Sequence, residues 1–272
     1  MSEEKLKKDF KSKLLKHVEL FTKAVSTDNG DWIIKGFIDI LKNIYTISVD
    51  TKVVSKVMEI LIFPKMIIFA KENDYKLLLC EEQNAYPDLT FIDTAGNKYA
   101  VDIKSTYRKN NDEVNGMTLG AFTGYFRDRK SKKNSVFPYG DYVGHFVLGI
   151  VYSRNASKAS ERKVYKIEDL ININSVIKDI TFFVQEKHLI AVDRPGSGNT
   201  KNIGSVNKIK DLIEGNGPFK KLGEDVFDDY WMYYLTKDMA KEVELKTPPY
   251  RNLTEYFEYK KVKSKKRSKR AI

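Results

Sequence analysis

Apolar residues recur at helical spacing in two stretches of the N-terminal part of the chain. In residues 3–25, leucine, phenylalanine and valine are spaced three or four positions apart among many lysines, which predicts one amphipathic helix packed on the fold. A second helix is predicted from Asp50 to about Lys71, because Asp50 is suited to cap its first turn. Pro64 should bend or divide this second helix, since proline lacks the amide hydrogen that an inner turn needs.

The middle of the chain predicts a β-sheet. Residues 89–93 and 98–104 are short runs rich in strand-forming residues, joined by Thr94-Ala95-Gly96-Asn97, a favourable turn sequence. A hairpin at the edge of the fold is predicted for residues 32–47. Further strands are predicted at 76–80, 145–152, 181–184 and 189–192, and further helices at 206–214 and 224–236. This order of elements is typical of a mixed α/β (α+β) fold.

The composition is that of a globular protein with a basic end. The 272 residues are 42% hydrophobic and 12% aromatic, enough to bury a sizeable core. The net charge of +11 favours a polyanionic partner, but residues 260–272 alone contain eight Lys or Arg and no acid, so they supply +8 of it. Such a tail is as typical of a solvated chain end as of a nucleic-acid contact.

The number and spacing of cysteines and histidines, and the length of the apolar runs, exclude several classes of protein. Cys80 is the single cysteine, so no intramolecular disulfide can form, and the histidines at 17, 145 and 188 are too scattered to predict a zinc cluster. No apolar run is long enough for a membrane span, and the N-terminus does not resemble a signal peptide. We therefore expect a soluble, cytoplasmic protein that does not bind membranes.

The chemistry is carried by two short motifs, Tyr86-Pro87-Asp88 and Asp102-Ile103-Lys104, which have the form PD, thirteen residues, then DxK. Side chains alternate along a strand, so Asp102 and Lys104 should face away from their apolar neighbours, and the turn at 94–97 should bring Asp88 beside them. Two carboxylates suit a hard cation such as Mg²⁺, and an ammonium beside them could stabilise negative charge on a phosphate. An ion pair at the end of a sheet would give the same pattern without any catalysis.

Several motifs in one order extend this pattern. Asp50-Thr51-Lys52-Val53, a helix containing Glu59, Gln83-Asn84, the two motifs above, Thr118-Leu119-Gly120, Val136-Phe137-Pro138, Gly196-Ser197-Gly198-Asn199-Thr200 and Asn202-Ile203-Gly204-Ser205 follow one another along the chain. Over roughly residues 34–255 this series resembles the EcoRV-type type II restriction endonucleases of the PD-(D/E)xK nuclease superfamily. The resemblance implies a restriction-endonuclease-like fold, with a central mixed β-sheet flanked by helices and a DNA-recognition subdomain.

The resemblance also implies roles for individual residues. It implies that Asp88 and Asp102 bind Mg²⁺, which Mn²⁺ could replace, that Lys104 assists catalysis, and that Glu59 is an auxiliary acidic ligand. The implied DNA contacts fall in three groups: a major-groove recognition loop at Gly196, Ser197, Gly198, Asn199, Thr200 and Lys201, a minor-groove loop at Gln83 and Asn84, and phosphate contacts at Thr106 and Tyr107. Glycine permits a close backbone approach to a base, and asparagine both donates and accepts hydrogen bonds.

The function implied is Mg²⁺-dependent hydrolysis of double-stranded DNA at a short palindrome, with GATATC as the candidate site, cut centrally to blunt ends with 5′-phosphates. A palindrome requires a two-fold symmetric reader, hence a homodimer. A companion DNA methyltransferase and a bacterial cytoplasm are also implied. The chain divides into a domain at 1–255, with a catalytic core at about 50–155 and a recognition subdomain at about 156–255, and a basic flexible tail at 256–272.

Departures from the family pattern at Glu82, Ala85 and Gly124 leave the exact DNA site open. Two other functions remain as alternatives. A repair or junction-resolving nuclease of the same superfamily would share Asp88, Asp102 and Lys104 but would lack a base-reading loop. A catalytically silent DNA-binding protein would use the basic surface and would bind DNA without Mg²⁺ and without cleavage.

Overall fold

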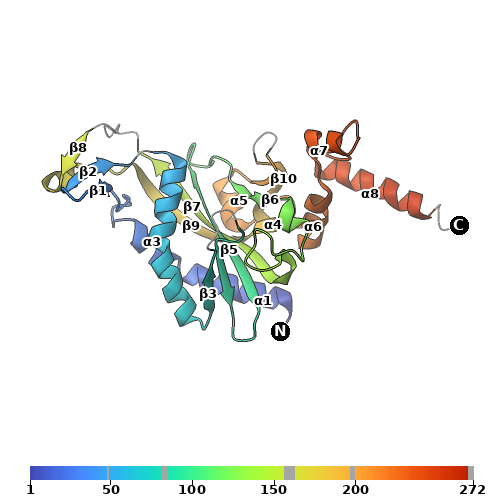
Figure 1. The fold of residues 1–272 in the computed structure, drawn as a ribbon, viewed down its shortest axis with the longest axis horizontal. Helices are drawn as coiled ribbons and strands as arrows, with labels where there is room; N and C mark the ends of the chain where they lie inside the picture. Colours follow the sequence, from blue (N-terminus) through green and yellow to red (C-terminus); the bar gives the residue numbers. More distant parts are fainter. Residues whose placement is uncertain (48, 81–84, 156–162, 197–199, 269–272) are drawn as a thin grey trace.

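The fold centres on a five-stranded sheet in the order β3-β4-β5-β7-β9 (Figure 1). The computed structural model describes residues 1–272 except 48, 81–84, 156–162, 197–199 and 269–272. The five strands are β3 (Lys76–Leu79), β4 (Leu89–Ile92), β5 (Lys98–Tyr107), β7 (Tyr142–Arg154) and β9 (Ile177–Glu186). β5 and β7 are parallel and the other neighbours are antiparallel. The sequence-based prediction of a central mixed sheet flanked by helices is therefore confirmed.

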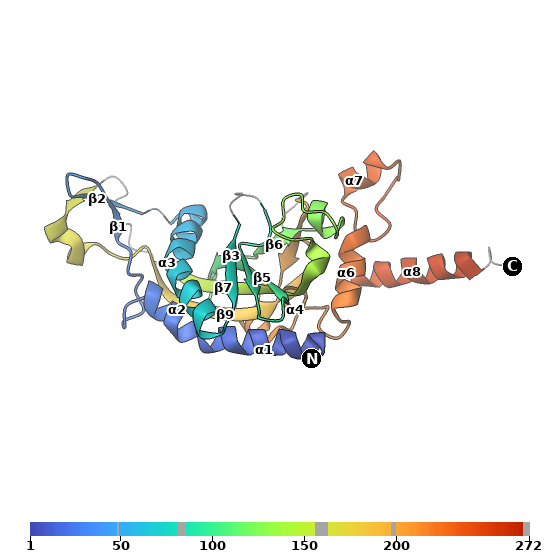
Figure 2. The ribbon, with the colours of Figure 1, turned by 60° about the horizontal axis from the view of Figure 1, so that its bottom comes forward.

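Three helices cover one face of this sheet: α1 (Glu3–Lys16), α2 (Val18–Val25) and α3 (Thr51–Glu72) (Figure 2). The single helix predicted for residues 3–25 is divided at His17, whose imidazole bonds the Lys13 carbonyl and the Glu72 carboxylate. These contacts tie the corner between α1 and α2 to the end of α3.

Helix α3 begins as predicted, because the Asp50 side chain accepts hydrogen bonds from the amides of Lys52 and Val53. The prediction that Pro64 could divide it is wrong, since the helix continues to Glu72. Proline removes one backbone hydrogen bond, whereas Ile62 and Met66 on either side of it are fully buried and hold the helix on the sheet.

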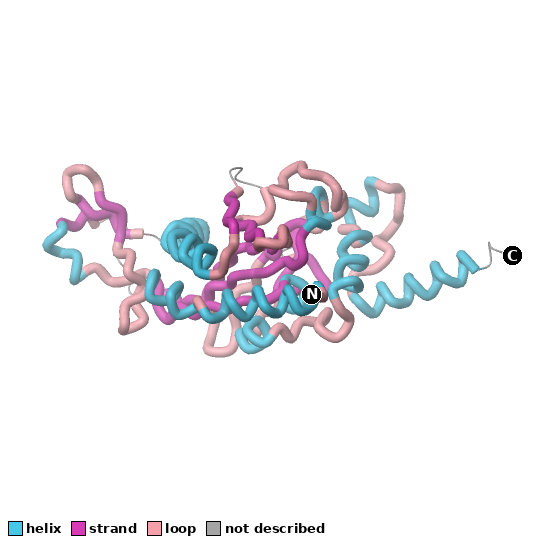
Figure 3. Tube along the Cα trace, turned by 90° about the horizontal axis from the view of Figure 1, so that it is seen from below, coloured by secondary structure: helices cyan, strands magenta, loops and turns pink. Residues whose placement is uncertain are grey.

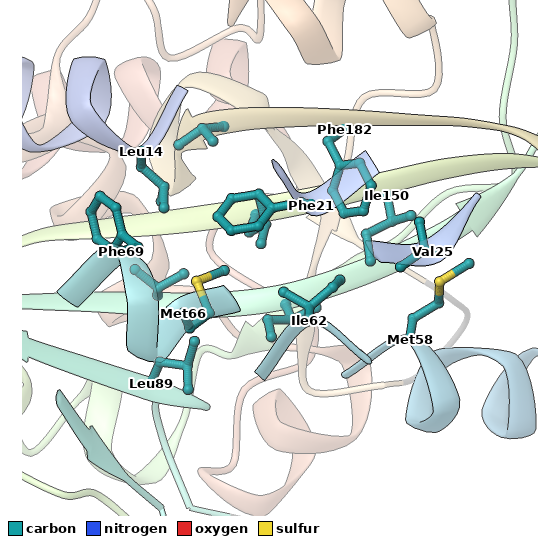
Figure 4. Packing of buried hydrophobic residues seen from close by; sticks show 14 of the residues in the cluster. Leu14, Phe21, Val25, Met58, Ile62, Met66, Phe69, Leu89, Ile150 and Phe182 are labelled. Carbon is teal, nitrogen blue, oxygen red and sulfur yellow. The ribbon is translucent and has the colours of Figure 1, made fainter. Parts of the chain in front are cut away.

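The core on this face is built from all three helices and the sheet (Figure 4). Leu14 and Phe21 from the N-terminal helices and Ile62 from α3 pack against Ile150 of β7 and Phe182 of β9. Phe10 stacks on Tyr99 of β5 with ring centroids 4.4 Å apart. Burial of this apolar surface fixes which face of β5 points inwards.

The opposite face carries a second layer. A small sheet in the order β10-β11-β6 lies here, formed by β10 (Ala191–Pro195), β11 (Asn202–Ser205) and β6 (Thr118–Ala121). Helices α4 (Lys187–Ile190), α5 (Ile209–Glu214), α6 (Glu224–Tyr233) and α7 (Lys237–Glu242) belong to this side, and α8 (Leu253–Ser268) follows them in the chain. The strand predicted at 189–192 begins only at Ala191, because residues 187–190 form α4, and the short strand β6 was not predicted.

The C-terminal segment is helical as far as Ser268, although the sequence predicts a basic tail from residue 256. Helix α8 begins on the aromatic cluster around Tyr230 and Tyr250, where Tyr256 is buried, and then leaves the body of the protein (Figures 1 and 3). Within the described ranges, no helix combines the length and the apolar character needed to cross a bilayer.

A third, small sheet lies at the end of the molecule opposite α8 (Figures 1 and 3). It has the order β1-β2-β8, formed by β1 (Gly36–Ile38), β2 (Asn43–Thr46) and β8 (Val164–Lys166), with the 3-10 helix η3 (Ile167–Asn172) next in the chain. The hairpin predicted at 32–47 is confirmed by the antiparallel pairing of β1 with β2.

Candidate active site

A tight turn sets the register of the hairpin that carries both motifs. Gly96 has φ +86°, a conformation that side chains disfavour, and its amide donates to the Asp93 carbonyl. The Asp93 carboxylate accepts hydrogen bonds from the amides of Ala95 and Asn97. With this turn closed, Leu89 of β4 pairs with Val101 of β5, so Asp88 and Asp102 come next to each other at the end of the pairing.

Successive side chains of β5 point alternately to the hydrophobic core and to the candidate active site, as predicted. Val101 and Ile103 belong to the helix-covered core. On the other face, the Lys104 Nζ lies 3.4 Å from Asp102 Oδ2 and 3.5 Å from Asp88 Oδ2. Two further hydrogen bonds fix Asp88. The Ile103 amide donates to Asp88 Oδ2 at 2.7 Å, and the Asp88 amide donates to Asp102 Oδ1 at 3.4 Å. The structure therefore brings Asp88, Asp102 and Lys104 together.

Two carboxylates share one ammonium group in this site. Burial raises the pKa of Asp88 to about 6, the negative charge of Asp102 adds to the effect, and Lys104 opposes it. Burial disfavours the charged Lys104, but the charges of Asp102 and Asp88 outweigh it and raise the pKa of Lys104 above its ordinary value. The ionised carboxylates thus carry one negative charge more than Lys104 balances, and all their donor atoms are oxygens, which fits a hard divalent cation such as Mg²⁺.

In metal-free protein, Asp88→Asn should raise the melting temperature at pH 8. The pKa of Asp88 in the folded chain, about 6, lies above the ordinary value of 3.8 for an aspartate, so ionising this carboxyl destabilises the fold. That cost is fully present above pH 6 and disappears below about pH 4, where folded and unfolded chains both hold the proton. A gain of about 2–4 °C at pH 8 is expected after allowing for solvent screening.

Circular dichroism melts in chelator at pH 8 and pH 5 would measure this gain, which should shrink at the lower pH. Asp74→Asn is the matched control, because Asp74 is exposed at φ +57°, where asparagine is tolerated. A variant less stable than the parent at pH 8 would contradict the inference that ionised Asp88 destabilises the metal-free fold.

The two motifs open onto a groove of about 960 Å³. Helix α3 forms one wall with Lys52, Lys56 and Glu59, and β5 and the segment 115–118 form the others. Glu59 lies in this groove but is paired with Lys56 at 2.8 Å. It does not join Asp88 and Asp102 in a group of ligands within 4.8 Å, so the structure gives it a neighbouring position only.

The predicted phosphate contacts lie along the same groove. Thr106 is buried, and its hydroxyl donates to the Asn115 carbonyl, so a phosphate contact by this hydroxyl would have to replace that bond. The guanidinium carbon of Arg154 lies over the Tyr107 ring, 3.5 Å from the centroid of that ring. Gln83 and Asn84 lie outside the described residues, between Cys80 and Ala85, which both line the groove.

The predicted recognition loop connects β10 to β11, and Ser197, Gly198 and Asn199 in it lie outside the described residues. Its base is closed by the Gly196 amide, which donates to the Asn202 carbonyl. A Cβ at Gly196 would lie 2.9 Å from Thr118 Cγ2, and Thr118 lines the groove. Thr200 buries its hydroxyl without a hydrogen-bond partner in the described part of the chain, whereas Lys201 is exposed. The start of the loop at Gly196 therefore lies beside the groove.

Sequence reasoning missed Lys187, which lies behind the pair of carboxylates. Its Nζ is buried, has no hydrogen-bond partner among the described residues, and lies 5.0–5.8 Å from the ring centroids of Tyr86, Phe126 and Tyr139. Burial lowers the pKa of Lys187 to about 8, although Asp102 attracts its charge. No local signal could have found it, because a lysine after a strand is ordinarily exposed.

Comparison with known proteins is consistent with this geometry. Residues 28–261 match the family model described as restriction endonuclease EcoRV. The chain is 36% identical over 236 residues to the type II restriction enzyme EcoRV of Escherichia coli, across 86% of this chain and 93% of that protein. The family match contains both motifs of the β4–β5 hairpin and the base of the β10–β11 loop.

Proposed function

Since the chain belongs to the restriction endonuclease EcoRV family, we propose that it cuts double-stranded DNA at a short palindromic site with Mg²⁺ as its metal ion. As a family member it is a type II site-specific deoxyribonuclease, and its activity depends on a metal. The observation that carries the proposal is the convergence of Asp88, Asp102 and Lys104 at a groove with lysines on its wall. The candidate site is GATATC, cut at the centre to blunt ends with 5′-phosphates.

The proposed chemistry is hydrolysis of one P–O bond in each strand. Asp88 and Asp102 would hold the metal, which neutralises the phosphate and lowers the pKa of bound water. Lys104, held charged by the two carboxylates, would stabilise the extra negative charge that develops on the phosphate oxygens. Glu59 would act from the α3 wall as an auxiliary acid, and Mn²⁺ could replace Mg²⁺ because it also accepts oxygen ligands.

Base reading is proposed for the loop between β10 and β11. Gly196 to Lys201 would enter the major groove, Gln83 and Asn84 the minor groove, and Thr106 and Tyr107 would contact phosphates. The support is positional, because Gly196 at the base of the loop lies close to Thr118 on the wall of the catalytic groove. The division into a catalytic core at about 50–155, a recognition subdomain at about 156–255 and a basic end from 256 belongs to the same proposal.

We further propose a homodimer that forms through the small sheet β1-β2-β8. This end of the molecule exposes a set of apolar side chains unusual for a surface: Phe37, Ile38, Ile40, Leu41, Val164, Ile167, Leu170 and Ile171. The occupant proposed is a second copy of the chain, because a palindromic DNA site requires a two-fold reader. A companion DNA methyltransferase is expected to protect the host genome, without a stable complex.

Ile171→Asp should weaken the dimer on the order of a hundredfold, because two symmetry-related apolar contacts would each be lost. The fold of each subunit should be unchanged, since Ile171 is already 90% exposed. Sedimentation equilibrium measures the effect. Val243→Asp, at an exposed position on the end of α7, is the control. A monomeric parent protein, or a variant as dimeric as the parent, would refute this interface.

Digestion of a fully sequenced plasmid tests the whole proposal. With Mg²⁺, discrete blunt fragments are expected, and sequencing their ends gives the site; chelator should abolish them. Mn²⁺ should restore cleavage. DNA that is bound but remains intact would instead favour the silent DNA-binding alternative, and fragments without a common end sequence would favour a nuclease of the same superfamily that lacks base reading.

A further inference from the structure

A second cluster of ionisable side chains lies away from the catalytic groove. Among the residues that the structure describes, one group of three potential metal ligands has all its ligand atoms within 4.8 Å of one another: Glu186, His188 and Glu224. Glu186 ends β9, His188 follows it in α4, and Glu224 begins α6. None of the three lines the groove of Asp88 and Lys104. We refer to them as the β9–α6 cluster.

His188 points to a ligand at this cluster. Its side chain is buried, with 8% of the residue exposed, yet its Nδ1 has no hydrogen-bond partner in the described part of the chain. The Glu186 Oε2 lies 3.8 Å from this Nδ1, beyond hydrogen-bonding distance. A buried ring nitrogen left without a partner costs free energy, and native structures rarely tolerate that cost without a reason.

Lysines of α1 balance the two acids of this cluster in the metal-free chain. Burial raises the pKa of Glu186 and the carboxylate of Glu224 adds to that rise, whereas Lys7 and Lys11 oppose it. Lys7 of α1 compensates by pairing with Glu224 at 2.5 Å, but it also pairs with Glu3 at 2.8 Å. Lys7 could therefore leave Glu224 and keep an acidic partner.

We propose that Glu186, His188 and Glu224 form a second metal site, which binds Zn²⁺ or a similar transition-metal ion and is separate from the catalytic centre. An imidazole together with two carboxylates suits Zn²⁺, whereas Mg²⁺ prefers oxygen ligands alone. Bonds of about 2.0–2.2 Å place tetrahedral ligands about 3.4 Å apart, so small side-chain rotations would close the cluster around the ion. Water would complete the fourth position.

The bound ion would join the end of the catalytic sheet to the layer that carries the proposed recognition loop. β9 is an edge strand of the five-stranded sheet, while α6 packs through Trp231 and Phe227 in the second layer. In the metal-free chain, the Lys7–Glu224 ion pair joins α1 to α6. The sequence predicts no zinc cluster, because His188 and Glu224 are distant in the chain and only folding brings them together.

Zn²⁺ binding to full-length protein, followed by isothermal titration calorimetry, tests the proposal. The measurement uses an Asp88→Asn/Asp102→Asn background, which removes the groove as a competing site. One Zn²⁺ per chain is expected, and at a hundredfold excess over the dissociation constant it should raise the melting temperature by about 5 °C, whereas Mg²⁺ should not. Glu224→Gln and His188→Phe should each weaken Zn²⁺ binding by at least about tenfold.

Lys7→Met provides the sharpest test, because it removes the cation that competes for Glu224. It should strengthen Zn²⁺ binding by about tenfold, although it also removes an ion pair from the fold. A purely structural role for the cluster would instead give a less stable protein with unchanged Zn²⁺ affinity. The proposal is overturned if Zn²⁺ binds no better than to Glu224→Gln, or if Lys7→Met leaves the affinity unchanged.

Discussion

Asp102→Asn should lower the rate of DNA cleavage at saturating Mg²⁺ by at least about a thousandfold. The substitution keeps the shape of a side chain that is only 5% exposed, so the β4–β5 hairpin should stay in place. It removes a full negative charge from the proposed metal site and leaves Lys104 paired with Asp88 alone. The loss should therefore fall on the chemical step, as measured by single-turnover cleavage of a short duplex.

Binding of the same duplex should be unchanged or tighter in Asp102→Asn, because a carboxylate facing a phosphate repels it. Electrophoretic mobility shifts without metal measure this. Asp74→Asn, exposed and outside the groove, should cleave at the rate of the parent. Cleavage by Asp102→Asn within tenfold of the parent would remove Asp102 from the metal site, and a loss of DNA binding together with the melting transition would indicate damage to the fold instead.

The parts of the site that could be predicted from sequence are those fixed by local rules. The turn at 94–97 is encoded by Gly96 and by the carboxylate of Asp93, and it sets the register that joins Asp88 to Asp102. The alternation of polar and apolar side chains on β5 then orients Lys104 towards them. The turn and the strand alternation, both short-range rules, were therefore enough to predict that Asp88, Asp102 and Lys104 meet.

The parts that could not be predicted depend on burial by distant segments. Lys187 reads as an ordinary exposed lysine, and only the packing of Tyr86, Phe126 and Tyr139 around it shows that its ammonium is buried beside the site. His188 meets Glu224 through the docking of α6, which no local pattern encodes.

Packing also decides the course of α3, where it overrides the tendency of proline to interrupt a helix. Pro64 is locally unfavourable in a helix, yet the buried residues on either side of it outweigh the lost hydrogen bond, and the helix runs on to Glu72. Propensity is a weak guide where tertiary burial is large.

Gly204→Ala should reduce discrimination between the cognate site and a site with one changed base pair by about ten- to a hundredfold. A Cβ at this position would lie 3.0 Å from the Arg194 carbonyl oxygen and 3.0 Å from the Gly196 Cα, both backbone atoms that cannot turn aside. β10 and β11 would have to separate, which displaces the loop that they hold. Loss of one well-placed base contact costs about 1–3 kcal/mol of discrimination.

Cleavage rates on the site found by plasmid digestion and on its single-base variants give this ratio. Gly140→Ala is the matched control, because its Cβ would make only ordinary contacts of 3.4 Å or more with Arg129. Lower stability with an unchanged discrimination ratio would mean that the β10–β11 stem supports the fold but does not position base-reading groups. A lower discrimination ratio with unchanged cleavage of nonspecific sites would instead show that the stem acts in recognition and not in catalysis. This outcome is expected because Asp88, Asp102 and Lys104 belong to the β4–β5 hairpin and not to the stem.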